Sequence, residues 1–146
     1  MEYNFYGNSN VDNIINTSNI RPDIKNPKAL YDALTGIWCR QTCAPRLQDS
    51  WSESNMTVGQ CSITAFLCQD IFGGEVYGLK SSSGIHCYNV IDGVIFDLTS
   101  EQFEERAKDL VYDLSVDAKQ DREMAHHFGK SEKRERYEYL KAKLLE

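Results

Sequence analysis

The chain has 146 residues, of which 41% are hydrophobic and 11% aromatic, a size and composition typical of a single globular domain. Its net charge is −6, with basic residues mixed among acids, which argues against a nucleic-acid-binding surface. The first residues lack a basic and apolar leader and no apolar run could span a bilayer, so we expect a cytoplasmic protein. The five cysteines have no regular disulfide spacing, which predicts reduced thiols.

The first half of the chain predicts an arm, a helix and a loop. Residues 1–26 are polar and rich in asparagine and predict an irregular N-terminal arm. Asn26 and Pro27 then suit the N-cap and the first position of a helix. Apolar residues follow at helical spacing, so we expect an amphipathic helix over residues 27–39. Residues 43–57 have no sustained period and predict a long loop.

The next stretch predicts a central helix with a thiol at its start. Gly59 permits a close backbone approach, and the residues after Cys61 place apolar side chains on almost every side of a helix. This pattern is typical of a buried helix, and Gly73-Gly74 would end it. Free N–H groups and the helix dipole favour a thiolate on the first turn. Cys61 is therefore a candidate nucleophile.

A strand and a hairpin follow. Residues 75–80 alternate as a strand, and residues 81–84 suit a flexible turn. Asp92-Gly93 lies between two β-rich runs, which predicts a two-residue hairpin turn. This turn would pair Ile91 with Val94, Asn89 with Phe96, Tyr88 with Asp97, and His86 with Thr99. The period of two then places His86 and Asp97 on one face as diagonal neighbours, and Cys87 on the other face.

The last third of the chain predicts two more helices. Residues 99–102 fit a capping box with Thr99 as N-cap, so a helix should begin directly after the hairpin. Residues 131–146 predict a charged helix with a narrow apolar stripe formed by Tyr137, Leu140 and Leu144. We find no internal repeat and no linker, and interpret residues 1–146 as one domain with its core at about residues 27–115.

Three of these residues suit nucleophilic catalysis. A thiol nucleophile needs a base for its proton and a group that orients the base. Cys61, His86 and Asp97 would fill these roles if the helix that begins at Cys61 packs on the face of the hairpin that carries the other two. The backbone N–H of Cys61 is the natural first donor to an oxyanion, and Gln60 and Trp51 are candidates for a second donor or a substrate contact.

Short motifs around these residues resemble known families. Gly59-Gln60-Cys61, His86 before an aromatic, and Asp97-Leu98-Thr99 resemble the Gly-Gln-Cys, His-x-Trp and Asp-Pro-Thr series of transglutaminase-like and papain-like cysteine enzymes. More closely, five stretches in order resemble the YunG-like family of small bacterial proteins: residues 59–65, 69–75, 84–89, 92–93 and 97–103. The resemblance implies an α+β fold of papain-like or transglutaminase-like architecture, with the central helix packed on a small antiparallel sheet and flanked by helices.

Two functions are then open. The chain is either a cysteine-dependent hydrolase or acyltransferase that forms a thioester with an amide, small-molecule or peptide substrate, or a non-catalytic binding or regulatory module on the same scaffold. An open cleft between Cys61 and His86 would favour the enzyme. A cleft filled by Trp51, by the arm or by residues 81–84 would favour the module. The enzyme needs no cofactor.

The remaining thiols and histidines suggest no further site. Cys68 and Cys87 are expected to be core thiols. Cys39 and Cys43 are spaced for one helical turn but lack a second pair, so they are a weak zinc signal, and we expect no metal site. The neighbours His126 and His127 suit a solvated surface pair.

Overall fold

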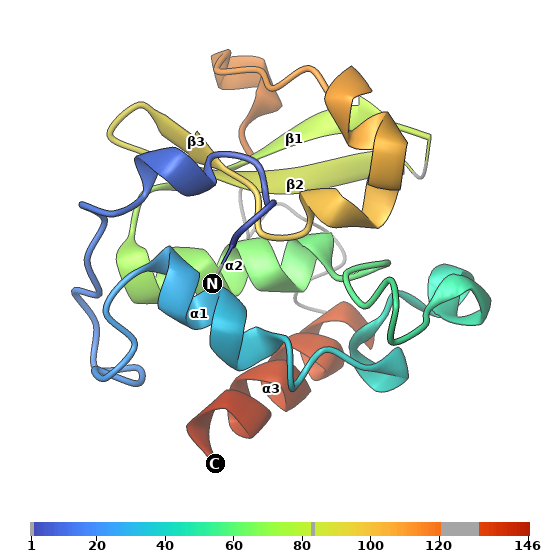
Figure 1. Ribbon diagram of the computed structural model, residues 1–146, viewed down its shortest axis with the longest axis horizontal. Helices are drawn as coiled ribbons and strands as arrows, with labels where there is room; N and C mark the ends of the chain where they lie inside the picture. The colour runs from blue at the N-terminus through green and yellow to red at the C-terminus, as the bar shows by residue number, and fades with distance from the viewer. Residues whose placement is uncertain (1, 83, 121–131) are drawn as a thin grey trace.

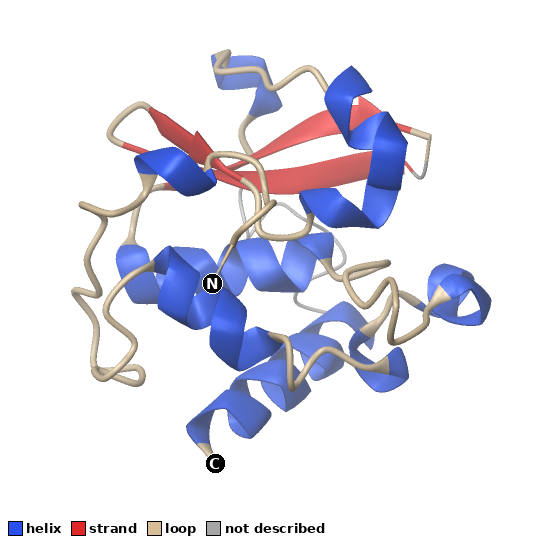
Figure 2. Cartoon of the chain, viewed as in Figure 1, coloured by secondary structure: helices blue, strands red, loops and turns tan. Residues whose placement is uncertain are grey.

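The computed structural model describes residues 2–82, 84–120 and 132–146. Its helices are α1 (Pro27–Leu34), α2 (Cys61–Phe72) and α3 (Glu132–Leu145), and its strands are β1 (Glu75–Ser81), β2 (Gly84–Ile91) and β3 (Val94–Phe96). Short 3₁₀ helices join them: η1 (Asn8–Asn10), η2 (Arg40–Thr42), η3 (Pro45–Ser50), η4 (Ser100–Asp109) and η5 (Val116–Ala118). The predicted mixed α+β fold with a small antiparallel sheet is confirmed, and α2 lies between the sheet and α3 (Figures 1 and 2).

Helix α1 begins where the sequence predicts. The Asn26 side chain accepts a hydrogen bond from Ala29 N at 2.9 Å, and Pro27 is the first helical residue. The helix ends at Leu34 and not at residue 39. After this early end the chain turns, and the Trp38 indole donates to Thr64 Oγ1 of α2 at 3.0 Å. The early end of α1 thus allows Trp38 to form a buried hydrogen bond with α2.

Helix α2 is the buried central helix that its apolar pattern predicts. Of its 12 residues, nine are buried. Gly73 follows it with a φ of 85°, a left-handed conformation that favours glycine and ends the helix. The Asn89 side chain of β2 donates to the Ala65 carbonyl at 2.9 Å, which ties the helix to the sheet.

The sheet has the order β1-β2-β3, and all its strands are antiparallel. Asp92 and Gly93 have φ values of 50° and 81°, as a type I′ turn requires. The pairs of Ile91 with Val94 and of Asn89 with Phe96 are confirmed.

The predicted pairing fails beyond Phe96, where β3 ends. Asp97 and Thr99 do not pair with Tyr88 and His86. Asp97 N instead donates to the Tyr6 carbonyl at 3.0 Å, because the N-terminal arm lies beside the chain at this point (Figure 1).

Helix α2 covers the other face of the sheet from the one expected. Cys87 and Phe96 share the main apolar core with α2, whereas Tyr88 and Val90 belong to a smaller cluster on the opposite face. Cys61 was expected to meet His86 on the condition that α2 packs on the face of His86. This condition is not met, although the two side chains do form a hydrogen bond.

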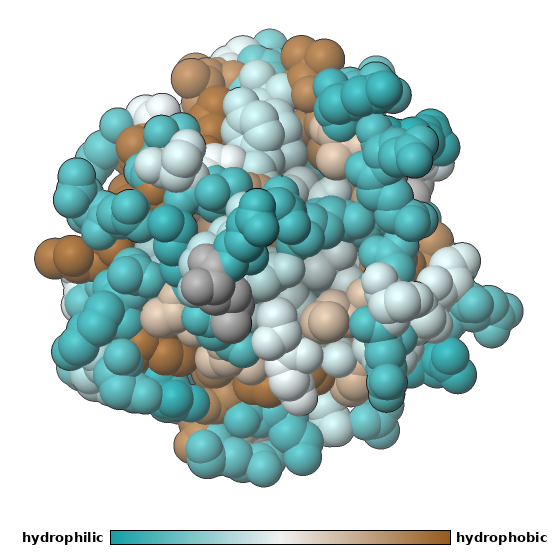
Figure 3. Space-filling view, viewed as in Figure 1, coloured by the Kyte–Doolittle hydropathy of each residue, from teal (hydrophilic) through white to brown (hydrophobic). Residues whose placement is uncertain are grey.

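The apolar core also takes in residues outside the range 27–115. The predicted stripe of α3 is buried against it, as are four residues of the N-terminal arm: Phe5, Val11, Ile14 and Ile24. The arm passes close to β3 at Gly7, where a Cβ would lie 2.2 Å from the Ile95 carbonyl oxygen. The face of the molecule in Figure 3 is mostly hydrophilic, and no helix among the described residues is long and apolar enough to cross a membrane.

The capping box at residues 99–102 was wrong. Helix η4 is a 3₁₀ helix with a kink at Glu104, where φ is 52°. The helix begins directly after the hairpin with Thr99 in the N-cap position, as predicted, but the Thr99 side chain makes no capping bond, because its hydroxyl donates to Asp97 Oδ1 at 3.2 Å. The side chain of Gln102 is therefore available for other contacts.

Candidate active site

Cys61 is the first residue of α2 and lines a cavity of about 600 Å³. The start of β2, η3, η4 and α3 form the other walls. Gly59 lets the chain approach the loop before η3, since its φ is 72° and a Cβ there would lie 2.4 Å from Cys43 Sγ. His86, Cys87, Gln102 and Phe103 line the same cavity.

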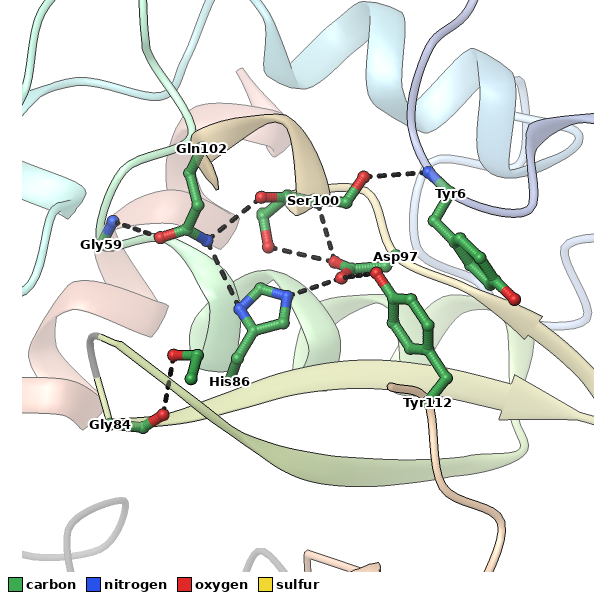
Figure 4. Close-up of polar contacts among 10 residues, drawn as sticks. Tyr6, Gly59, Gly84, His86, Asp97, Ser100, Gln102 and Tyr112 are labelled. Carbon is green, nitrogen blue, oxygen red and sulfur yellow. Dashed lines mark hydrogen bonds and ion pairs between the residues drawn. The ribbon is translucent and has the colours of Figure 1, made fainter. Parts of the chain in front are cut away.

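The structure brings His86 and Asp97 into direct contact. His86 Nε2 lies 2.5 Å from Asp97 Oδ2, and the two side chains are 2% and 1% exposed. Tyr112 Oη donates to the same carboxylate oxygen at 2.7 Å, and Thr99 N donates to the other at 3.1 Å. Figure 4 shows the imidazole ring between Gln102 on one side and Asp97 on the other.

The N-terminal arm supports this carboxylate. In addition to the backbone bond between Tyr6 and Asp97, Tyr6 N donates to Ser100 Oγ at 2.9 Å. The Tyr6 ring stacks on Tyr112 with 4.0 Å between the ring centroids. The arm thus positions both Asp97 and the tyrosine that donates to it.

These contacts shift the pKa values of the thiol and the imidazole in opposite directions. Burial lowers the pKa of His86, but the charge and hydrogen bond of Asp97, together with Cys61, raise it to about 10. The pKa of Cys61 lies well below its usual value because hydrogen bonds from Cys87 and His86 outweigh the effect of burial. A thiolate beside an imidazolium is the state that these shifts favour.

Gln102 is a site residue that the sequence analysis assigned to a helix cap. Its Nε2 donates to the Thr99 carbonyl at 3.1 Å, and its Oε1 accepts from Gly59 N at 3.4 Å. These bonds determine the orientation of the amide, so the –NH₂ group faces His86 Nδ1 at 3.5 Å. Its place in the family motif of residues 97–103 was the signal that could have identified it.

Cys87 is also part of the site, and not only a core thiol. Because α2 packs on the face of the sheet that carries Cys87, its first residue meets this side chain. The thiols of Cys61 and Cys87 form a hydrogen bond. Cys68 is a buried thiol, as expected, whose pKa is raised by burial.

Gln60 and Trp51 do not reach the cavity. The Gln60 side chain is fully buried and donates to the Cys39 carbonyl at 3.1 Å. The Trp51 indole donates to the Met56 carbonyl at 2.9 Å. Neither residue lines the cavity, so neither supplies a second oxyanion donor there.

No group of three or more His, Cys, Asp or Glu side chains within residues 2–82, 84–120 and 132–146 could hold a metal ion. Burial raises the pKa of Cys43 to about 11, which opposes the thiolate that zinc binding needs. His126 and His127 lie outside the described residues.

Comparison with known proteins supports the resemblance to the YunG-like family, and not the one to transglutaminase-like and papain-like enzymes. The sequence model of the family described as "YunG protein" matches residues 26–146. A protein of Bacillus subtilis (strain 168) named "Uncharacterized protein YunG" is 38% identical over 65 residues, which are 44% of this chain and 56% of the relative. The chain thus spans just over half the length of that relative. No solved structure matches the chain.

Proposed function

We propose that this chain, which belongs to the YunG family, is a cysteine-dependent hydrolase or acyltransferase that acts on an amide or peptide-type bond. One observation carries the proposal. Cys61 and His86 line a single cavity of about 600 Å³, and the imidazole is held 2.5 Å from the buried carboxylate of Asp97. Nucleophile, base and orienting group are the parts that covalent acyl transfer requires.

In the first half of the reaction, the Cys61 thiolate attacks the carbonyl carbon of the substrate. The backbone N–H of Cys61, at the first turn of α2, donates to the oxyanion that forms. His86 gives its proton to the leaving amine, the C–N bond breaks, and an acyl thioester remains on Cys61.

In the second half, His86 takes a proton from water or from an acceptor amine. The activated oxygen or nitrogen attacks the thioester carbon, the C–S bond breaks, and the acyl product leaves. The proton on His86 and the thiolate on Cys61 are then restored. Asp97 stabilises the imidazolium before the first half and after the second.

The order of the parts along the chain supports a papain-like or transglutaminase-like architecture as part of this proposal. The cysteine begins the central helix, the histidine follows on a strand of the antiparallel sheet, and the aspartate comes after the next strand. Of the three segments that could fill the cavity, neither Trp51 nor the N-terminal arm is among the described residues that line it, whereas Ser81 of the turn forms part of its wall. The space of about 600 Å³ that remains beside Cys61 supports the enzyme over the binding module.

Alkylation by iodoacetamide tests the proposal. We expect Cys61 to react near neutral pH at least tenfold faster than Cys68, and His86→Ala to slow this reaction at least tenfold. Cys68 serves as a control within the same molecule, since it is fully buried. Peptide mass mapping gives both rates. Equally slow alkylation of both thiols would contradict the enzyme and favour a binding module.

A further inference from the structure

Of the charged side chains that line the cavity beside Cys61 within the described part of the chain, three are positive and one is negative, although the net charge of the chain is −6. Arg46, Lys133 and Arg136 line it, and Glu132 is the acidic residue among the lining residues that the structure describes. Arg136 Nε lies 2.5 Å from Glu132 Oε2, so these two charges offset each other. Arg46 is a further positive charge of the wall.

Asp97, His86 and Cys61 do not cancel the positive charge of the cavity wall. Asp97 does not line the cavity, is 1% exposed and contacts the imidazole of His86. The thiolate of Cys61 and the imidazolium of His86 offset each other in turn. The first turn of α2 adds the partial positive charge of its free N–H groups.

Apolar side chains form another part of the wall. Pro45, Leu47 and Phe66 line the cavity, and Ile85 lies in its wall with 52% of its surface exposed. Arg46 lies beside Gly84, the residue before this isoleucine, because a Cβ on Gly84 would be 3.5 Å from the Arg46 guanidinium. A positive charge and an apolar surface therefore meet at the start of β2.

We infer that the cavity selects an acyl substrate that carries a carboxylate next to an apolar group. The inference rests on the proposed function and adds the substrate class to it. A cavity with positive walls concentrates anions and speeds their association, and this effect weakens as salt is added. The apolar wall would bind the part of the substrate beside the carboxylate.

Iodoacetate and iodoacetamide test the inference, because one carries a carboxylate where the other carries a neutral amide. The measurement is the ratio of the two alkylation rates of Cys61, divided by the same ratio for 2-mercaptoethanol. We expect a value of roughly ten for the wild-type protein that falls with added salt. Arg46→Glu should lower this value several-fold. Because Arg46 is exposed, the variant should keep the fold, which comparison of its circular dichroism spectrum with that of the wild-type protein checks.

Lys25→Glu is the matched control, since it makes the same change of charge at an exposed residue that does not line the cavity. It should leave the ratio unchanged. An equal ratio in the Arg46→Glu and wild-type proteins, or an equal fall in both variants, would overturn the inference while the proposed function stands. Slow alkylation of Cys61 by both reagents would overturn the proposed function, and the inference with it.

Discussion

His86 Nε2 lies 2.5 Å from Asp97 Oδ2, although Asp97 has already left the sheet. The carboxylate is held on both of its oxygens, by the Tyr112 hydroxyl on one and by Thr99 N on the other. Its position relative to the imidazole therefore depends on η4, on the segment before η5 and on the N-terminal arm, and not on cross-strand pairing.

Asp97→Asn should slow the alkylation of Cys61. Without the carboxylate, His86 loses the charge and hydrogen bond that raise its pKa most, and Cys61 alone opposes the effect of burial. The pKa of the imidazole therefore falls, and the thiolate loses its protonated partner. We expect the iodoacetamide rate at neutral pH to fall on the order of tenfold or more. Rates measured over a range of pH check this.

Tyr112→Phe is the control for that variant, since it removes one hydrogen bond to Asp97 and leaves the charge. We expect it to change the rate by less than about threefold. A wild-type pH profile in Asp97→Asn would show that the carboxylate does not act on Cys61 through His86.

The paired ionisation of Cys61 and His86 predicts how stability depends on pH. In the unfolded chain the thiol loses its proton near pH 9.0 and the imidazole near pH 6.5. In the folded protein Cys61 is a thiolate, and His86 keeps its proton up to about pH 10. Between pH 6.5 and 9.0 both states thus bind one proton, and this pair adds no pH dependence to the free energy of unfolding.

Cys61→Ser leaves His86 as the titrating group. The raised pKa of His86 then contributes stability that is complete below pH 6.5 and is lost as the pH rises toward the folded value. Relative to wild type, we expect the free energy of unfolding to fall by up to roughly 1.4 kcal/mol per pH unit between pH 6.5 and the folded pKa of His86, and no further than pH 9.0. The folded pKa of His86 is lower in this variant than in wild type, because Cys61 no longer raises it. Urea titrations of both proteins at several pH values give the difference, in which the other cysteines cancel. Parallel curves would contradict the thiolate–imidazolium pair.

Gln102 should oppose protonation of His86, which makes it a positioning residue. Its amide hydrogens face Nδ1, and they can donate only to a nitrogen that carries no proton. Removal of the amide in Gln102→Ala should therefore favour the imidazolium and the thiolate. We expect the midpoint of the pH profile of Cys61 alkylation to move down by roughly half to one unit.

Gln120→Ala is the comparison for this shift. Gln120 also lines the cavity, but its amide donates to the Ala118 carbonyl. This variant should keep the wild-type midpoint. If the midpoint is unchanged in Gln102→Ala, or moves equally in both variants, Gln102 does not oppose the protonation of His86.

The sequence predicts local structure well in this chain. The Asn26-Pro27 start of α1, the all-round apolar pattern of α2 and the Asp92-Gly93 turn depend on neighbouring residues, and all three appear as predicted. The hairpin register is right up to Phe96 for the same reason.

Contacts between segments that are distant in the sequence could not be predicted from neighbouring residues. Nothing near Asp97 indicates that Tyr6 would pair with it, and this pairing ends the hairpin early. The side of the sheet that α2 covers depends on total burial, since both faces carry apolar residues. For this reason Cys87 was assigned to the core and Gln102 to a cap, although both line the cavity.

Cys87 gives the sharpest test of how the thiolate is stabilised. Its thiol donates to Cys61, and this hydrogen bond is the largest contribution to the low pKa of Cys61. Cys87→Ala removes the donor and should raise that pKa by roughly one unit, whereas Cys87→Ser keeps a hydroxyl donor and should change it less. The ultraviolet absorbance of the thiolate, followed over pH, measures both.

Cys68→Ala is the matched control, because it removes another thiol of the same helix that is buried away from the cavity wall. It should leave the titration of Cys61 unchanged. If Cys87→Ala and Cys68→Ala titrate alike, His86 and the start of α2 alone hold the thiolate. If Cys87→Ala raises the pKa of Cys61 and Cys68→Ala does not, the Cys87 thiol helps to stabilise the Cys61 thiolate.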